Sequence, residues 1–291
     1  MPPTAHIAIP EAVPVAPRPR GQDGALFLRA ERIAGRTRLT EVTQRPPLAT
    51  VRGLYLDPVV PDMCFSTIAS SAGGVLQGDR LHIDVSVGEH ARLHLGTQSA
   101  TRIYRMPDAG ATIDSAFRVA ADGYLEYLPD PYLPYASSRL KTRTRCDVDP
   151  GGALIVSETV AAGRVASGES LAFERIESRM EIAVGGEVVA RDALRLDPAD
   201  GLTRVGRLGP WRVVGSLFVV RAGFDAVLLQ AVIEPDRPGT IAGASTLPSA
   251  AGAWLRVLAD EPAGAAAVIR AAWTAARVAI LGAPPPLDRR P

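Results

Sequence analysis

Cysteine is scarce in this chain of 291 residues: there are two, Cys64 and Cys146, and neither belongs to a Cys-x-x-Cys pair. Two isolated cysteines argue against a disulfide framework, a structural zinc site and a thioredoxin-like motif. Free cysteines are among the residues most often buried, so we expect both thiols to lie in the core.

An excess of charge of one sign is also lacking, since 32 Lys and Arg residues balance 31 Asp and Glu residues. Nucleic-acid-binding proteins usually show a strongly basic balance or a basic patch with interleaved aromatics, so we expect no nucleic-acid partner. No uninterrupted apolar run approaches the length that crosses a bilayer, and the N-terminus lacks a basic region followed by an apolar one. These absences predict a cytoplasmic protein without a membrane partner.

Motifs of common enzymes are missing as well, including Gly-x-Ser-x-Gly, the Walker phosphate loop and the zinc-binding His-Glu-x-x-His. The glycine-rich stretch 73–79 precedes a segment of period two, not a helix whose N-terminus could hold phosphate. We interpret it as a tight loop that needs positive φ angles. The sequence therefore predicts that the protein is not an enzyme.

What the sequence does contain is a long region of period two, which is typical of strands with one buried and one wet face. It lies between a proline-rich leader, 1–23, predicted to be disordered, and an extended tail, 283–291. Residues 24–282 form one predicted β domain that ends in an alanine-rich helix over about 262–281. Later strands are predicted at 176–184, 188–196, 213–220, 226–233 and 253–258.

A unit of about 30 residues recurs in the middle of the chain: an alternating strand, a Gly-bearing turn and a second short strand. Val87, Val119 and Val148 precede the three turns. Such a period favours stacked coils, in which each repeat covers the apolar face of its neighbour. An antiparallel sandwich of similar hairpins is an equal alternative. The predicted fold class is mainly β, β-helix-like or two-layered, with one or two C-terminal α-helices.

The histidines and the basic residues of 139–148 are both expected at the surface of the protein. His82, His90 and His94 fall close together, but His82 and His94 alternate with apolar neighbours that should take the core face, so we expect them at the surface. Residues 139–148 split into an apolar face and a charged face, and the charged face is predicted to be solvated.

Four carboxylates, Asp79, Glu126, Asp130 and Glu158, fall near the ends of the repeated arms, where stacking would bring polar groups together. If they point inward they line a wet polar seam whose oxygens suit a hydrated divalent ion. The alternative is that they are solvated strand-end carboxylates, because buried unpaired carboxylates are costly. The residues alone leave both interpretations open.

Four motifs then follow one another in order: Gly73-Gly74-x-x-x-Gly78-Asp79-Arg80-Leu81, Thr97-x-x-Ala100-Thr101-Arg102-Ile103-Tyr104-Arg105, Leu125-Glu126-Tyr127-Leu128-Pro129 and Glu158-x4-Gly163-Arg164-x3-Gly168-Glu169. In order and spacing they resemble UreD, the urease accessory protein family also called UreH, and the resemblance extends over about 24–281. The chain departs from the usual family pattern at Gln77, Tyr127, Pro131 and Ser157.

The resemblance implies a role in inserting nickel into apo-urease within a complex that contains UreF and, through UreF, the GTPase UreG, and it allows a dimer formed through that complex. It also implies an internal polar tunnel through which nickel passes. The residues expected to line this tunnel or to contact nickel transiently are Asp79, Glu126, Asp130, Glu158 and, as an outlying fifth, Glu169. No tightly bound cofactor is expected, only transient Ni(II). The alternatives are a β-solenoid scaffold without a metal conduit and, less favoured, a β-rich enzyme with paired carboxylates.

Overall fold

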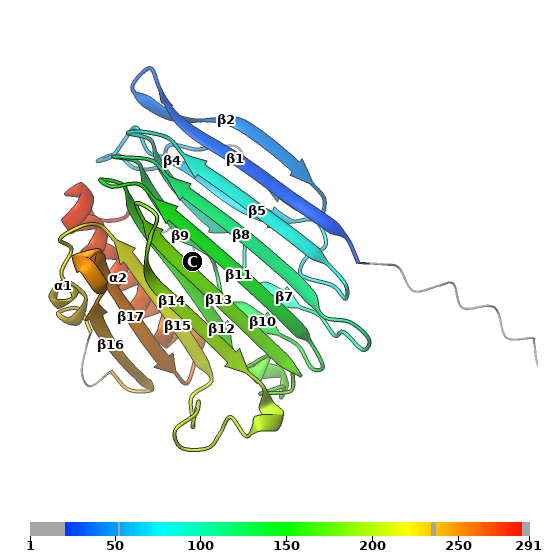
Figure 1. Cartoon of the computed structure of the whole chain (residues 1–291). Helices are drawn as coiled ribbons and strands as arrows, with labels where there is room; N and C mark the ends of the chain where they lie inside the picture. Colours follow the sequence, from blue (N-terminus) through cyan, green and yellow to red (C-terminus); the bar gives the residue numbers. More distant parts are fainter. Residues whose placement is uncertain (1–20, 52, 234–236, 287–291) are drawn as a thin grey trace, which may run out of the picture.

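Two β-sheets stacked face to face make up the fold, and a long helix covers the outer face of the second sheet (Figure 1). The structure is a computed structural model that describes residues 21–51, 53–233 and 237–286. The first sheet has the strand order β14-β13-β11-β8-β5-β1-β2. The second has the order β16-β17-β15-β12-β9-β6-β4-β3, with β7 and β10 paired beside it.

The strands are β1 (Asp23–Ile33), β2 (Arg36–Arg45), β3 (Leu48–Thr50), β4 (Cys64–Ser70), β5 (Arg80–Val87), β6 (Arg92–Thr97), β7 (Thr101–Ile103), β8 (Ala111–Val119), β9 (Tyr124–Leu128), β10 (Tyr132–Pro134), β11 (Arg139–Val148), β12 (Ala153–Ala161), β13 (Arg175–Val184), β14 (Glu187–Leu196), β15 (Val213–Val220), β16 (Thr240–Thr246) and β17 (Gly252–Ala259). The α-helices are α1 (Ala226–Gln230) and α2 (Pro262–Leu281).

The predicted repeat is a stack of parallel coils, each of which gives one strand to each sheet. In the first sheet Val87 pairs with Val119, Val119 with Val148 and Val148 with Val184. In the second sheet β4, β6, β9 and β12 pair in parallel in the same way. The stacked-coil interpretation is therefore confirmed over the antiparallel sandwich, although antiparallel strands flank the stack at both ends.

Two tight turns have the positive φ angles that their glycine-rich sequences predict. The loop 73–79 contains Gly73 and Gly78 with φ angles of 69° and 78°, as expected for a tight loop. Gly185 and Gly186, with φ of 57° and 85°, close the hairpin in which Val184 pairs with Glu187. Both cysteines are buried and free, which confirms their expected place in the core.

Apolar side chains form two layers of core. One lies between the two sheets, and the other lies between the second sheet and α2. Strand β15 is buried along its whole length because it faces the first sheet on one side and α2 on the other. Residues 139–148 show the predicted split, with Leu140, Cys146 and Val148 buried beneath a charged outer face.

One expectation about the elements was wrong, one strand was missed and one expectation falls mostly outside the described residues. Residues 226–233 were expected to form a strand, but Ala226–Gln230 is the helix α1, whose N-terminus is capped by the Asp225 side chain accepting from the Val227 N–H. Strand β16 was not predicted. The leader predicted for 1–23 lies outside the described residues except for 21–23, of which Asp23 already belongs to β1.

Helix α2 matches the expected C-terminal helix. Pro262 lies in its first turn, and Gly282 ends it with a φ of 69°. By length and composition alone it is apolar enough to cross a membrane. Its apolar character also has a local explanation, since it packs against β15, β17 and β12.

Candidate functional site

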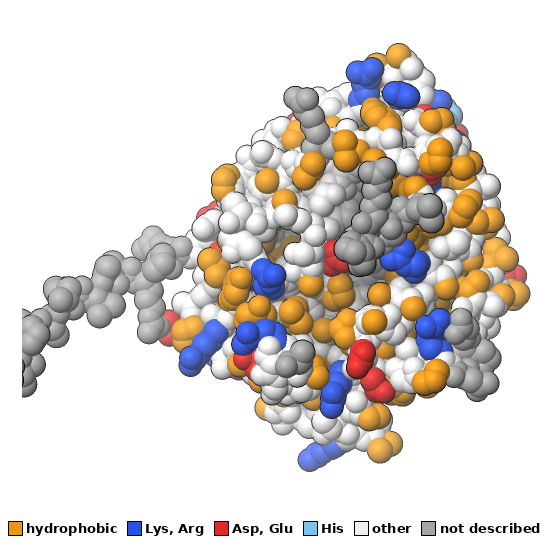
Figure 2. All heavy atoms as spheres, turned by 180° about the vertical axis from the view of Figure 1, so that it is seen from behind, with side chains coloured by type: hydrophobic (Ala, Val, Ile, Leu, Met, Phe, Trp, Pro, Cys, Tyr) orange, Lys and Arg blue, Asp and Glu red, His pale blue; other side chains and the backbone are white. Residues whose placement is uncertain are grey.

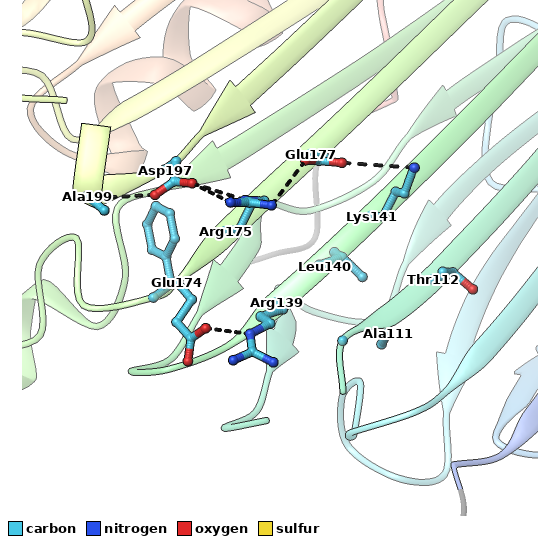
Figure 3. A pocket seen from close by; sticks show the side chains of 12 residues that line it. Ala111, Thr112, Arg139, Leu140, Lys141, Glu174, Arg175, Glu177, Asp197 and Ala199 are labelled. Atoms are coloured by element: carbon cyan, nitrogen blue, oxygen red, sulfur yellow. Dashed lines mark hydrogen bonds and ion pairs between the residues drawn. The ribbon is translucent and has the colours of Figure 1, made fainter. Parts of the chain in front are cut away.

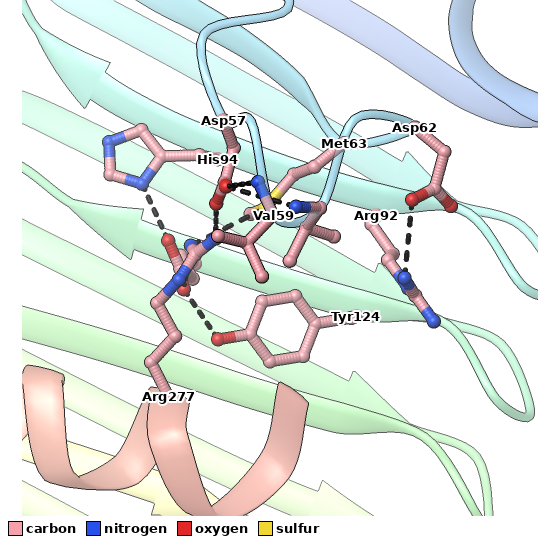
Figure 4. Close-up of polar contacts among 10 residues, drawn as sticks. Asp57, Val59, Asp62, Met63, Arg92, His94, Tyr124 and Arg277 are labelled. Atoms are coloured by element: carbon pink, nitrogen blue, oxygen red, sulfur yellow. Dashed lines mark hydrogen bonds and ion pairs between the residues drawn. The ribbon is translucent and has the colours of Figure 1, made fainter. Parts of the chain in front are cut away.

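Arg277 is the largest of the fully buried side chains in the described part of the chain, although it belongs to the helix α2, which covers the outer face of the second sheet. Its guanidinium forms an ion pair with Asp57 and donates to Glu126 Oε1 at 2.8 Å, and both carboxylates are buried too (Figure 4). The Arg277 Nε atom has no hydrogen-bond partner. A buried charge of this kind is stable only when it is paired, so the two carboxylates hold α2 on the sheet.

Glu126 is the centre of this network because three groups meet its two oxygens. Tyr124 donates its hydroxyl to Oε1 at 2.5 Å, and His94 Nδ1 lies 2.7 Å from Oε2. Burial raises the pKa of Glu126, but the hydrogen bond from His94 and the charge of Arg277 outweigh burial and leave the pKa lowered. Glu126 is therefore an ionised carboxylate with all of its neighbours in place.

His94 is not the surface residue that the alternation of β6 predicted. Its side chain is 16% exposed, and its ring contacts the rings of Phe65 and Trp273 at centroid distances of 5.0 and 5.5 Å. The alternation did assign His94 to the face opposite the inter-sheet core. That face is covered, however, because α2 supplies Trp273 from the far end of the chain.

A groove of about 1240 Å³ opens above His94 on the side that carries α2. Its walls come from Val51 and the segment 54–59, the strands β4, β6, β9 and β12, and helix α2 with the following prolines. Several apolar side chains along the segment are exposed: Val51, Leu54, Tyr55, Leu56 and Val59. Figure 2 shows this side of the molecule, over which hydrophobic side chains are widely spread.

Glu158 lies elsewhere, in a polar cluster between the two sheets. It accepts from Ser178 at 2.5 Å and from Thr142 at 3.3 Å. Burial, followed by the nearby charge of Asp192, raises the pKa of Glu158 despite these hydrogen bonds. Asp192 itself pairs with Arg256 at 2.6 Å. Of the predicted carboxylates, Glu158 is the one that fits a polar seam inside the stack.

The other predicted carboxylates have separate surroundings. Asp79 is buried and accepts from the backbone N–H groups of Gln22 and Leu76 at 2.9 and 2.8 Å. Asp130 lines the groove and meets the Thr97 hydroxyl. Glu169 pairs with Arg164 on a surface loop, and the hydrogen bond from Arg164 lowers its pKa. The five residues are therefore distributed over different places, and their predicted contact with nickel stays a prediction.

The first sheet has a second, smaller depression of about 860 Å³ (Figure 3). Its basic side chains meet acidic ones: Arg139 pairs with Glu174, and Arg175 with Asp197 at 2.9 Å. Lys141 lies 4.0 Å from Glu177. The charged face predicted from 139–148 thus consists of opposite charges that neutralise one another across neighbouring strands.

Metal-ligating side chains are not clustered in the part of the chain that the structure describes, since no group of three or more His, Cys, Asp or Glu residues could hold an ion there. Histidines His82, His90 and His94 therefore do not form a joint site. Asp57 and Arg277 were not among the predicted site residues. The one available signal was an arginine within the helix face that also carries Trp273 and Ala276.

Comparisons with known proteins agree with the motifs. Residues 22–291 match the family described as UreD urease accessory protein. The chain is 36% identical over 295 residues to "Urease accessory protein UreD 2" of Streptomyces griseus, covering 99% of each chain. It is 36% identical over 286 residues to "Urease accessory protein UreD" of Haloarcula marismortui, covering 97% of this chain and 94% of that one. A Brucella suis protein named "Urease accessory protein UreD 2" is also 36% identical over 90% of this chain and 89% of its own.

Proposed function

This chain belongs to the UreD family of urease accessory proteins, and we propose that it works in the cytoplasm as part of the complex that inserts nickel into apo-urease. The observation that carries the proposal is a family match along nearly the whole described domain, residues 22–291. The relatives are named accessory proteins and not enzymes. We accordingly assign the chain a role in assembly and not in catalysis.

The proposed partners are UreF, the GTPase UreG bound through UreF, and apo-urease. Support for a protein partner comes from the groove beside α2, whose rim exposes Val59 by 63% and Leu54 by 49%. Contiguous exposed apolar side chains around a hollow are typical of protein interaction sites. We propose this side of the molecule as a surface that a partner covers in the assembled complex.

We further propose that nickel passes through the interior of the protein on its way to urease. Glu158, Asp192 and Arg256 support this idea because they place charged groups between the two sheets, where a polar passage would run. Asp130 belongs to the groove side, and Asp79 and Glu169 are engaged by backbone and arginine donors. Glu158 is therefore the residue on which we would test a passage first.

A scaffold without a metal conduit is the second candidate function. The different surroundings of the five predicted carboxylates favour it, because a passage needs polar groups that follow one another along a path. A scaffold should tolerate neutral replacements inside the fold, whereas a conduit should not. The two functions therefore differ in whether urease is still activated after a buried carboxylate is replaced by a neutral side chain.

The test is co-expression with the cognate UreF, size-exclusion chromatography and a nickel-dependent urease-activation assay with UreG present. Under the conduit function, Glu158→Gln forms the complex but lowers nickel loading of urease severalfold, whereas Glu177→Gln on the outer face is the matched control and behaves as wild type. Under the scaffold function both variants activate fully. If the wild-type chain neither binds UreF nor supports activation, the accessory role itself is wrong.

A further inference from the structure

We propose that segment 287–291, which follows Pro286 and lies outside the described residues, binds in the groove beside α2 and competes there with a partner protein. Binding of the segment concerns this chain alone. The competition rests on the proposed function, since it requires the groove to be the surface that a partner covers. The argument depends on the path of the chain after α2, on the lining of the groove and on the composition of the segment.

The chain turns back onto the molecule after α2 instead of leaving it. Gly282 ends the helix with a φ of 69°, and its N–H donates to the Val278 carbonyl. Ala283, the next residue, has no exposed surface. The prolines 284–286 then line the groove. The chain is therefore already at the groove where segment 287–291 begins.

The segment is long enough to span the groove. Four neighbouring strands of the second sheet, in the order β12-β9-β6-β4, contribute to the lining. Neighbouring strands lie about 4.8 Å apart, so the four extend over about 14 Å. A chain that continues the extended conformation of the prolines advances about 3.1 Å per residue, and five residues cover about 15 Å.

Aromatic rings and an unused donor give the groove a lining that suits a proline-rich chain. Tyr55, Phe65 and Trp273 belong to it. The Trp273 Nε1 atom is buried and has no hydrogen-bond partner in the described part of the chain. Proline-rich segments bind in grooves lined by aromatic side chains, and each proline offers a carbonyl oxygen but no N–H. A chain that arrives through three prolines brings acceptors to this donor.

The side chains of the segment complement those of the groove. Segment 287–291 has the sequence Leu-Asp-Arg-Arg-Pro. Its leucine matches the exposed apolar rim, to which Leu54 and Val59 belong. Asp130 and Arg270 line the groove with opposite charges, and the segment carries arginines for the one and an aspartate for the other. Complementary charges of this kind fix the register of a bound chain.

Trypsin cleavage after Arg289 in the full chain tests the proposal, because a protease cuts a bound segment only while it is open. Intact mass measures the loss of the two residues that follow. A segment on a short tether has an effective concentration in the mM range, so a site with an affinity of about 0.1 mM keeps it bound roughly nine-tenths of the time. Release by Leu287→Asp should then raise the cleavage rate by about tenfold.

A change in the groove separates binding from the preference of the protease. Val59→Asp leaves the cleaved sequence intact and should raise the rate similarly, and adding Leu287→Asp to it should raise the rate no further. Val278→Asp is the matched control, since Val278 is an exposed valine of α2 that does not line the groove. It should leave the rate unchanged. Equal rates in wild type and the Leu287 and Val59 variants would overturn the inference.

Two further outcomes are decisive. Protection that is lost on dilution would assign the segment to the groove of a second copy and overturn the contact within one chain. In isothermal titration calorimetry, Leu287→Asp should bind UreF about tenfold more tightly than wild type, because the partner no longer displaces the segment. Equal affinities would overturn the competition. Urease activation by the wild-type chain would leave the accessory role intact in either case, and a chain that neither binds UreF nor activates urease would still show the cleavage pattern.

Discussion

Arg277 and Asp57 lie 220 positions apart in the sequence and meet as an ion pair in which neither side chain is more than 1% exposed. Asp57 also accepts from the backbone N–H groups of Val59 and Val60, so one carboxylate joins the helix α2 to the apolar rim of the groove. The position of the rim therefore depends on the helix.

Replacing Arg277 by methionine should lower the free energy of unfolding by about 3–5 kcal/mol, because Asp57 and Glu126 would stay buried without their cation. Urea denaturation followed by circular dichroism measures the loss. Arg179→Met, at an exposed position of β13, is the matched control and should change stability by less than about 1 kcal/mol. A triple variant with Asp57→Asn and Glu126→Gln added should recover part of the loss; an Arg277→Met variant as stable as wild type would contradict the buried network.

Glu158→Gln should change how stability depends on pH. The pKa of Glu158 is raised in the folded protein above its ordinary value of 4.5. Below pH 4.5 the carboxyl is therefore protonated in the folded and in the unfolded protein, and folding buries no charge at this position. As the pH rises through the raised pKa, the folded wild type loses stability that the glutamine variant keeps. Unfolding in urea at a series of pH values should show the variant gaining stability relative to wild type as the pH rises above 4.5, on the order of 1.4 kcal/mol for each unit of the shift. A constant difference would refute the raised pKa.

Asp79→Ala should destabilise the loop 73–79. The carboxylate accepts from Gln22 N and Leu76 N, and each buried donor left without an acceptor costs about 1–3 kcal/mol. Asp79→Asn keeps one carbonyl oxygen and should lose less. Thermal unfolding of the two variants gives the order, and a nickel-loading assay per folded molecule separates this structural role from the predicted contact with nickel.

The two thiols should be inert in the folded protein. Burial raises the pKa of Cys64 to about 11, and burial together with the charge of Asp147 raises that of Cys146 further. A thiol reagent such as Ellman's reagent should therefore modify neither cysteine of the folded protein at about pH 8. In urea, which unfolds the protein, both cysteines should be modified completely within the same time. Rapid reaction of one thiol per chain in buffer would show that a buried cysteine becomes accessible.

Local periodicity was enough to predict the repeat, because the positions of Val87, Val119 and Val148 recur at the spacing of one full coil, but it left an antiparallel sandwich as an equal alternative that only the strand pairing excluded. The segment 226–233 was misread for a related reason: a short apolar run does not distinguish a strand from a helix, and the Asp225 cap decided it. The fold was therefore predictable where the pattern extended over several repeats and not where it was short.

The candidate site was less predictable because its parts come from distant segments. Nothing local indicates that Arg277 is buried, since its partners Asp57 and Glu126 are brought to it only by tertiary packing. For the same reason His94 was assigned to the correct face of its strand and to the wrong environment. Alternation tells which side chains share a face; it does not tell what covers that face.

The helix α2 is also the last element of the described fold to leave the ribosome. Until it emerges, the strands of the second sheet carry Glu126 and the segment carries Asp57 without their cation, and the apolar face that α2 covers is open. A chain that stops short of Arg277 thus presents unneutralised carboxylates beside bare hydrophobic surface, which are the features that chaperones and proteases recognise.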